Sequence, residues 1–481
     1  MNNALLSVEQ MTRADHLATT MGTPGFKLMQ NAGRAVARET ARRWSPRPTT
    51  VLCGPGNNGG DGFVAAVALA EAGWPIRVAL SGRLEQMQGD ALAHAQRWQG
   101  PIAALDEGAL EGAELVVDAL YGSGLNRELK PPVAQLLSII GGRGIPVIAI
   151  DVPSGVLGDS GESLGAVAAS CTVTFARKKP GHLLLPGREL CGDLVVADIG
   201  IPDAAFDTLG INTWENEPGL WRAALPQLQR SANKYSRGHV LINGGYPISG
   251  AARMAARAAA RIGAGLTTIA VPDAALPIYA AALQSIMVQP LSSPQDFERL
   301  LKDSRYSGFL IGPGAGVNDA TRERALRMLA TGRPVLLDAD AISVFAADPN
   351  QLFNAVRGPC VLTPHEGEYR RLFSDTDDKL SRARQAAVRS QCIIVLKGAD
   401  TVIASPDGRA VINSNAPATL ATGGSGDVLG GMILGLLGQG MDAFLAACAA
   451  VWLHGAAAAG FGPGLLAEDL PDLIPGVLRG L

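Results

Sequence analysis

Short runs of β-branched and aliphatic residues alternate with longer Ala-rich segments along most of the chain. In the first half these runs are TTVLCG (49–54), IRVALSG (76–82), LVVDAL (115–120) and PVIAID (146–151), with helical patterns such as FVAAVALAEAG between them. The runs are apolar throughout instead of at every second position, which is typical of parallel strands covered on both faces. This alternation predicts an α/β fold built on a parallel sheet.

A second series of the same kind begins at HVLING (239–244) and continues through LTTIAV, GFLIGPG, PVLLDAD, CVLTPH and IIVLKG. Between the two series, residues 212–230 contain few β-branched runs and several helix and strand breakers, so we place a domain boundary there. A chain of 481 residues is also too long for one ordinary hydrophobic core. We therefore predict two α/β domains, residues 1–212 and 225–481.

The charged residues argue against nucleic acid and membrane partners. The 41 basic and 44 acidic residues are spread along the chain and give a net charge of −3, so no strongly basic surface is expected. The expected partners are small molecules. Six scattered Cys residues without a CxxC pair indicate a reducing, cytoplasmic compartment, and the N-terminal segment lacks the pattern of a secretory leader.

The most apolar region spans residues 428–461. Gln439, Gly440 and Asp442 interrupt it, so it predicts two buried helices and no membrane span. We expect a homo-oligomer, in which this helix pair belongs either to the core or to the interface.

The stretch CGPGNNGGDG (53–62) satisfies the glycine spacing of a dinucleotide-binding loop. In a dehydrogenase an acidic residue ends the next strand and holds the adenosine ribose, but here that strand ends in Ser81-Gly82-Arg83. The loop carries Asn57, Asn58 and Asp61 instead, which suggests that its side chains bind a ligand. The alternative is a strand-to-helix turn with capping Asn and Asp residues.

Two further strands of the first half end in a carboxylate. Asp118 ends one run and precedes YGSGL, and Asp151 ends another and precedes VPSG. Because the carboxyl ends of parallel strands form one edge of the sheet, these loops and CGPGNNGGDG are expected around one crevice.

The first half resembles the N-terminal domain of the YjeF family, the NAD(P)H-hydrate epimerase, which has a Rossmann-like three-layer αβα fold. Four motifs carry the resemblance in order, TPGFKLMQNAG, GPGNNGGDG, DALYGSGLNREL and DVPSG. It implies a K⁺ ion held by Asn58, Asp118 and Ser154, and proton transfer by Asp151 fits the chemistry of the substrate. The substrate-binding residues that it implies are Asn57, Asn58, Gly59, Gly60, Asp61, Gly122, Ser123, Gly124, Leu125, Asn126, Arg127, Glu128 and Asp151.

A second glycine loop, ATGGSGDVLGG (421–431), precedes a long apolar segment. The backbone N–H groups at the start of such a helix form an anion site, and Asp427 would stand in its first turn, where it can deprotonate an attacking hydroxyl. The alternative is a Gly-rich turn with an Asp cap.

The second half resembles the C-terminal domain of the YjeF family, the ribokinase-like ADP- or ATP-dependent NAD(P)H-hydrate dehydratase. The motifs are NKYSRGHVLINGG, GPGAG, LDADA, LTPHEGE and KGADT, in order and followed by GGSGD. The hydrate contacts that this implies are Ala251, Gly316, His365 and Asp427. The residues implied for the Mg²⁺-bound nucleotide are Lys397, Gly398, Ala399, Asp400, Thr401 and Gly426.

The two resemblances imply a bifunctional enzyme of metabolite repair, in which an epimerase supplies a stereospecific dehydratase. The nucleotide would phosphorylate the ring hydroxyl, with Asp427 as base, and the phosphate would then leave. The fusion of both halves favours ADP over ATP.

Two other functions stay open at this point: a kinase for a small alcohol, such as a hydroxymethylpyrimidine or a thiazole alcohol, and an N-terminal half that only binds a nucleotide-like ligand. For single residues, His365 is either a substrate contact or a neutral core histidine, and Lys397 either a nucleotide contact or a surface lysine.

Overall fold

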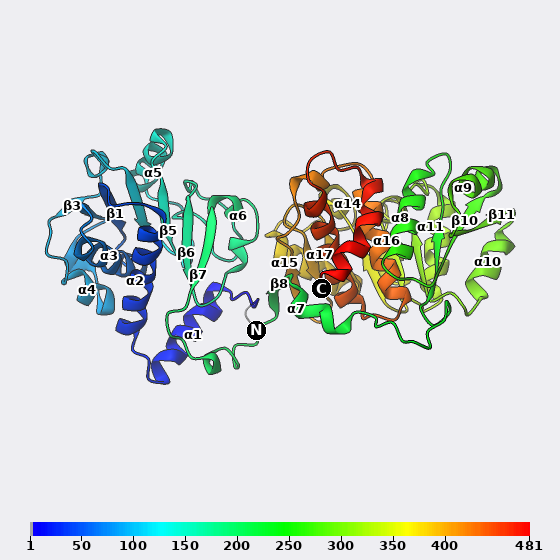
Figure 1. Cartoon of the computed structure of the whole chain (residues 1–481), viewed down its shortest axis with the longest axis horizontal. Coiled ribbons are helices and arrows are strands. Elements are labelled where there is room, and N and C mark those ends of the chain that lie inside the picture. Colours follow the sequence, from blue (N-terminus) through cyan, green and yellow to red (C-terminus); the bar gives the residue numbers. More distant parts are fainter. Residues whose placement is uncertain (1–2) are drawn as a thin grey trace. The chain divides into compact units, whose positions relative to one another are not determined.

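The computed structural model describes residues 3–481, which form two compact units that divide after Thr213 (Figure 1). Each unit contains its own central sheet covered by helices. The predicted α/β fold class is therefore confirmed in both halves, and the two units are described separately.

The N-terminal unit has a seven-stranded sheet in the order β3-β2-β1-β4-β5-β6-β7, in which all neighbouring strands are parallel. The central strands are fully buried, as their continuous apolar runs predict, whereas the edge strand β7 is partly exposed. The strands are β1 (Thr49–Cys53), β2 (Ile76–Leu80), β3 (Ile102–Ala104), β4 (Leu115–Ala119), β5 (Val147–Ile150), β6 (Cys171–Phe175) and β7 (Asp193–Ala197).

Helices cover both faces of this sheet. On one face α3 lies so close to β1 and β4 that a Cβ added to Gly62 would come within 2.5 Å of the Ala119 side chain. On the other face α5 packs its apolar side chains against Leu52 and Val116 of the same strands. The helices of this unit are α1 (Val8–Thr20), α2 (Gly25–Arg43), α3 (Asn57–Glu71), α4 (Gly89–Ala95), α5 (Pro131–Arg143) and α6 (Gly187–Leu190).

The strand order reverses beside β1, since β2 and β3 lie on one side of it and β4 to β7 on the other. The carboxyl ends of β1 and β4 therefore diverge into a crevice, which is where open α/β sheets bind ligands.

The C-terminal unit has a ten-stranded sheet in the order β11-β10-β9-β12-β13-β14-β15-β16-β17-β8. The strands from β11 to β15 are parallel to one another, and β16 runs antiparallel to both of its neighbours β15 and β17. The strand order again reverses beside β9. The strands are β8 (Thr213–Glu215), β9 (His239–Asn243), β10 (Leu266–Pro272), β11 (Met287–Leu291), β12 (Gly308–Ile311), β13 (Val335–Leu337), β14 (Cys360–Leu362), β15 (Ile393–Leu396), β16 (Val402–Ala404) and β17 (Ala410–Ile412).

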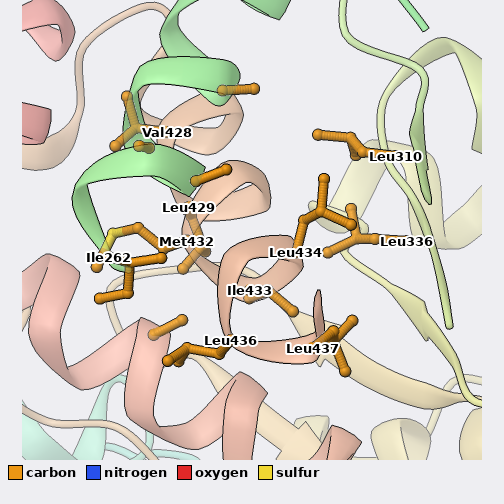
Figure 2. Close-up of a cluster of buried hydrophobic side chains, with 14 of the residues drawn as sticks. Ile262, Leu310, Leu336, Val428, Leu429, Met432, Ile433, Leu434, Leu436 and Leu437 are labelled. Carbon is orange, nitrogen blue, oxygen red and sulfur yellow. The ribbon is translucent and has the colours of Figure 1, made fainter. Parts of the chain in front are cut away.

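The core of this unit is built around α16, whose residues are all buried from Val428 to Gly438 (Figure 2). Its leucines contact Leu310 and Leu336 of the sheet on one side, and Ile262 lies on the other (Figure 2). The helices are α7 (Pro218–Trp221), α8 (Gly250–Arg261), α9 (Leu276–Ala282), α10 (Pro294–Lys302), α11 (Asp319–Ala330), α12 (Asp340–Ser343), α13 (Pro349–Phe353), α14 (Glu366–Leu372), α15 (Lys379–Ser390), α16 (Ser425–Gly438), α17 (Ala443–Phe461) and α18 (Leu470–Arg479).

The apolar region at residues 428–461 forms two helices, α16 and α17, as predicted. Among the helices of residues 3–481, α17 alone could cross a membrane by length and composition, but 67% of its apolar window is buried inside the unit. It packs against α16 and α18 as a core helix.

Candidate functional site

A pocket of about 790 Å³ lies at the carboxyl edge of the N-terminal sheet. The loops after β1, β4 and β5 line it, together with α1 and α2. The sequence-predicted residues that line it are Asn57, Asn58, Asp61, Gly122, Ser123, Gly124, Leu125, Asn126, Arg127 and Asp151. Three strand ends thus surround one cavity, as their positions in the sequence predict.

Three of the predicted substrate residues do not line this pocket, namely Gly59, Gly60 and Glu128. A Cβ on Gly59 would lie 1.8 Å from the Gly54 carbonyl oxygen, and one on Gly60 would lie 2.5 Å from a sulfur atom of α2. These two glycines therefore allow the loop and the helix to pack closely. The alternative reading of the loop as a capped turn is not supported, because no side chain caps the start of α3.

Asp151 is held by a buried network directly after β5. Its Oδ1 accepts hydrogen bonds from Lys179 Nζ (2.6 Å) and Thr174 Oγ1 (3.1 Å), and its Oδ2 accepts one from the Ser123 N–H (2.8 Å). The side chain of His182 donates from Nε2 to the Asp151 carbonyl, while its Nδ1 accepts from the Lys179 N–H. The backbone of Asp151 is left-handed, with φ of 66°. Such strain persists only where the surroundings enforce it, and it is common at functional sites.

The charge of Lys179 decides the ionisation of Asp151. Burial would raise the pKa of this carboxyl, but the Lys179 ammonium and the hydrogen bonds from Lys179 and Ser123 outweigh it and hold the pKa well below its ordinary range. Asp151 is therefore a permanent carboxylate whose two oxygens both accept hydrogen bonds. A carboxylate of this kind is suited to hold neighbouring groups in position and poorly suited to accept and release protons.

Asp118, near the carboxyl end of β4, is fully buried and does not line the pocket. Its oxygens accept hydrogen bonds from Ser154 Oγ (2.6 Å) and the Ser154 N–H (2.8 Å), and from the Leu120 N–H (3.2 Å). Burial raises the pKa of this carboxyl, and its hydrogen bonds offset the rise only in part. Among the described residues no cation pairs with it.

Three further carboxyls line the pocket, Asp15 on α1, Asp61 on α3 and Asp90 on α4. Burial raises the pKa of Asp15 to about 6, with Lys179 lowering it and Asp151 raising it. Burial also raises the pKa of Asp61 well above its ordinary value, and the charges of Asp151 and Asp15 add to this. The pocket therefore combines a fixed carboxylate with two carboxyls that hold protons more readily.

In the C-terminal unit, Asp427 stands in the first turn of α16, after the loop at residues 421–424. Burial raises its pKa to about 7, the nearby Asp338 adds to the rise, and Lys397 opposes it. A carboxyl that titrates near neutrality at a helix start is suited to accept a proton from a hydroxyl.

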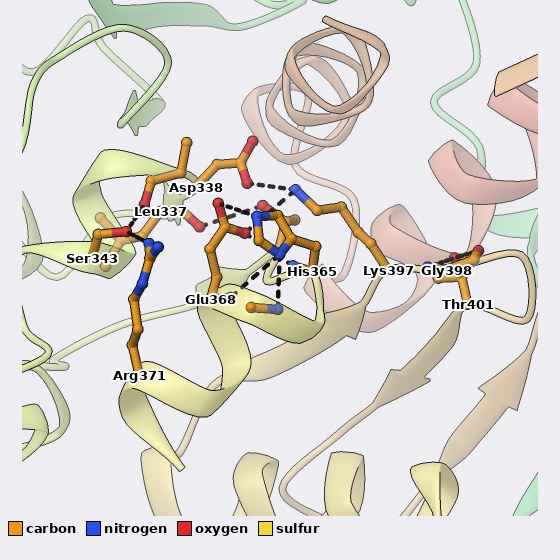
Figure 3. Close-up of polar contacts among 12 residues, drawn as sticks. Leu337, Asp338, Ser343, His365, Glu368, Arg371, Lys397, Gly398 and Thr401 are labelled. Carbon is orange, nitrogen blue, oxygen red and sulfur yellow. Dashed lines mark hydrogen bonds and ion pairs between the residues drawn. The ribbon is translucent and has the colours of Figure 1, made fainter. Parts of the chain in front are cut away.

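Lys397 directly follows β15, and it forms an ion pair with Asp338, the residue after β13 (Figure 3). Its Nζ lies 2.9 Å from Asp338 Oδ1 and 3.8 Å from Glu368 Oε2, and a Cβ on Gly426 would lie 3.3 Å from it. Burial would lower the pKa of Lys397, but the charges of Asp338 and Glu368 outweigh it and raise the pKa. Lys397 is thus a cation beside the glycine loop, and the surface-lysine interpretation is wrong.

His365 caps the start of α14 (Figure 3). Its Nδ1 accepts from the backbone N–H groups of Gly367 (2.9 Å) and Glu368 (3.3 Å), and its Nε2 lies 3.3 Å from Glu368 Oε1. The side chain is 56% exposed, so the interpretation as a core histidine is wrong.

The remaining residues predicted for this site lie on loops and helix starts. Gly316 has a left-handed backbone (φ of 82°), and its N–H donates to Asp340 Oδ2. Ala251 lies in the first turn of α8, the helix whose Met254 contacts the Gly424 position.

The segment from residue 398 to 401 is a tight turn. The Gly398 N–H donates to Thr401 Oγ1, which in turn donates to the Gly398 carbonyl (Figure 3). In this turn Asp400 pairs with Lys379 on α15, and Ala399 follows Gly398 directly.

Sequence reasoning missed four residues of these sites, Asp15, Lys179, Asp338 and Glu368. Asp338 and Glu368 stand inside the motifs LDADA and LTPHEGE. Asp15 and Lys179 lie outside the strand-end loops from which the sites were predicted. Among residues 3–481, no group of three or more His, Cys, Asp or Glu side chains is placed to hold a metal ion.

Two protein families match the chain in sequence. The family described as YjeF-related protein N-terminus matches residues 25–181, and the NAD(P)H-hydrate dehydratase family matches residues 239–474. The bifunctional NAD(P)H-hydrate repair enzyme Nnr of Coxiella burnetii is 37% identical, and the match covers 96% of each chain.

Two solved structures resemble the C-terminal half. The ADP/ATP-dependent NAD(P)H-hydrate dehydratase of Bacillus subtilis, co-crystallised with ATP and Mg²⁺, is 31% identical with a TM-score of 0.50, over 55% of this chain and 98% of that one. A ribokinase-like superfamily protein of Enterococcus faecalis has a TM-score of 0.51 at 24% identity, over 56% of this chain and 96% of that one, and it supports the fold alone. The match to the repair enzymes extends over both units, so the chain belongs to the family of bifunctional NAD(P)H-hydrate repair enzymes.

Proposed function

We propose that residues 1–212 form an epimerase that interconverts the R and S hydrates of NADH and NADPH, and that residues 225–481 form a dehydratase that restores NAD(P)H from the S hydrate with ADP or ATP. The observation that carries the proposal is Asp427, a carboxyl with a pKa of about 7 at the start of α16, beside the Lys397 ammonium. A base and an anion site therefore lie together, as phosphoryl transfer to a hydroxyl requires.

In the dehydratase, the hydroxyl on C6 of the hydrate attacks the terminal phosphorus of the nucleotide, and Asp427 accepts the hydroxyl proton. Lys397 and the N–H groups at the start of α16, including that of Gly426, stabilise the charge on the phosphate. The phosphate then leaves from C6 and a proton leaves from C5, which restores the ring double bond. The proposed hydrate contacts are Ala251, Gly316, His365 and Asp427. The turn at residues 397–401 is proposed to hold the nucleotide.

The nucleotide is proposed to enter as its Mg²⁺ complex, which neutralises part of the phosphate charge. The Bacillus subtilis dehydratase, which was crystallised with ATP and Mg²⁺, supports this choice. We take ADP as the preferred nucleotide only because the fusion of both halves resembles the bacterial type of this family.

In the epimerase, the pocket at the edge of the sheet is proposed to hold the hydrated ring. Its walls combine backbone amides of the loop after β4 with the carboxyls of Asp61 and Asp151. These groups can hydrogen-bond the ring hydroxyl and carboxamide. The permanent charge on Asp151 supports a positioning role for it in place of the proton transfer expected from the sequence.

A K⁺ ion is proposed to bind Asn58, Asp118 and Ser154. The donor set fits, because a carboxylate, a hydroxyl and an amide supply oxygen ligands for a hard cation. The Asp118 carboxylate is fully buried without a described counter-charge. A cation there would balance the buried charge and fix the loops that carry the three ligands.

A homo-oligomer remains our expectation for the assembly. Because α16 and α17 are core helices of their own unit, its interface must use other surfaces. The mass of the chain in solution, measured by light scattering, tests this.

The experiment for the proposed function follows the absorbance of reduced nicotinamide after mixing the chain with both hydrate epimers, K⁺, Mg²⁺ and ADP or ATP. Complete recovery is expected. Recovery that stops at the S fraction would contradict the epimerase, and a stable phosphorylated product without recovery would favour the alcohol kinase.

A further inference from the structure

The epimerase needs a group that can give and take a proton inside the pocket. Inverting C6 of the hydrate requires that a bond at this carbon breaks and forms again, and the departing oxygen must be protonated as it leaves. Such a group must face the ligand, must have no fixed partner and must be reachable by solvent. This inference rests on the proposed epimerase function.

The buried network around Asp151 does not provide this group. Both carboxylate oxygens of Asp151 accept hydrogen bonds. The Lys179 ammonium donates hydrogen bonds to Asp151 and Thr174, and its side chain is only 2% exposed. Both ring nitrogens of His182 are engaged, and burial lowers its pKa to about 4.

Asp15 meets all three requirements. It lines the pocket from α1 and keeps access to solvent, although the surrounding protein atoms partly desolvate its carboxyl. Among the residues that the structure describes, none donates a hydrogen bond to its carboxyl or pairs with it. Asp151 and Lys179 line the same pocket, and their charges act on Asp15.

We propose that Asp15 is the catalytic acid and base of the epimerase, and that Asp151 and Lys179 only position the substrate. The C6–O bond breaks with its electron pair on oxygen, which takes the proton of Asp15 and leaves as water. The lone pair of N1 forms the N1=C6 bond. Water then adds to the other face of C6 and returns a proton to the Asp15 carboxylate, while the N1=C6 pair returns to N1.

The ionisation of the pocket is consistent with this role. Asp15 has a pKa of about 6, so both of its forms are available near neutrality, whereas Lys179 keeps Asp151 ionised and burial favours the protonated form of Asp61. Enzymes commonly give neighbouring carboxyls different roles, because their different environments shift their pKa values apart. The other charged or titratable side chains that line the same pocket are His16, Asp61, Asp90, Tyr121, Arg127, Asp151 and Lys179.

The test compares Asp15→Asn with Glu9→Gln, which removes a carboxyl from the exposed side of the same helix. Exchange between the R and S hydrates is followed by chromatography from pH 5 to 8, with the spontaneous rate subtracted. For Asp15→Asn we expect kcat to fall by about 10²–10⁴-fold with KM nearly unchanged. In the wild type and in Glu9→Gln, kcat/KM should fall as the pH rises through about 6, because the acid form of Asp15 is lost.

Three outcomes are distinguishable. Asp15→Asn with wild-type kcat, or with a loss in KM alone, would overturn the proposal. A wild type that does not exchange the epimers at all would instead overturn the proposed epimerase. A melting transition of the N-terminal unit that is unchanged from the wild type shows that this unit is folded in Asp15→Asn.

Discussion

Lys397 and Asp338 form an ion pair inside the C-terminal unit, with Lys397 Nζ 2.9 Å from Asp338 Oδ1 and the Asp338 side chain only 2% exposed. The two residues follow different strands, β15 and β13, and the residue after Asp338, Ala339, has a left-handed backbone with φ of 48°. The pair therefore fixes two strand-end loops at the edge where Asp427 lies. It also places a cation next to the proposed phosphate position.

We predict that Lys397→Met destabilises the C-terminal unit by about 3–5 kcal/mol, because it leaves the Asp338 carboxylate buried without its partner. The double variant Lys397→Met with Asp338→Asn should recover most of this loss, since no uncompensated charge remains. Scanning calorimetry that resolves the transitions of the two units measures both. A single variant as stable as the double variant would contradict the role given to the pair.

Asp427 should control the pH dependence of dehydration. As a base it acts only when ionised, so the rate should rise with pH through about 7, and Asp427→Asn should lose about 10²–10⁴-fold in kcat. Asp319, an exposed carboxyl in the first turn of α11, is the matched control, and Asp319→Asn should keep the wild-type rate. A wild-type rate that falls between pH 6 and 8 would exclude Asp427 as the base.

The same carboxyl has an opposite effect on stability. Because its folded pKa is raised above the ordinary 3.8, the fold favours the protonated form, and this contribution is complete below pH 4 and lost as the pH rises through about 7. Asp427→Asn should therefore raise the melting temperature of the C-terminal unit at pH 8 but not at pH 4. Equal melting temperatures of the wild type and Asp427→Asn at pH 8 would show that the ionised Asp427 carboxylate does not destabilise the fold.

The fold class, most of the central strands and the strand-end loops could be predicted from the sequence, because continuous apolar runs and glycine loops are local signals. It did not reveal β3, β6, β7, β8, β11, β16 and β17. Length alone does not explain this, because β13 and β14 also have three residues each and were predicted. Lys179 was missed for an identifiable reason. It lies 28 residues from its partner Asp151, outside the quoted motifs, and only the adjacency of β5 and β6 in the sheet joins the two segments.

A bound K⁺ ion should stabilise the N-terminal unit. The melting temperature of the wild type should rise when KCl replaces choline chloride at equal ionic strength, since a ligand that binds only the folded state adds to its stability. In Asp118→Asn this gain should disappear, because the buried carboxylate is the charged ligand of the proposed site. A wild type with the same melting temperature in both salts would exclude a cation at Asp118.

Close packing of α16 against α8 should depend on Gly431. A Cβ at this position would lie 2.0 Å from the Ala255 carbonyl oxygen of α8, so Gly431→Ala must push the two helices apart and should cost about 1–3 kcal/mol. Gly460 near the end of α17 is the control, because a Cβ there meets nothing within 4 Å and Gly460→Ala should be neutral or stabilising by up to about 1 kcal/mol. Displacing α16 would also move Asp427 in its first turn, so we expect Gly431→Ala to slow dehydration while epimerisation keeps its rate. If Gly431→Ala matched Gly460→Ala in stability and in both activities, the helix contact would be neither tight nor coupled to the site.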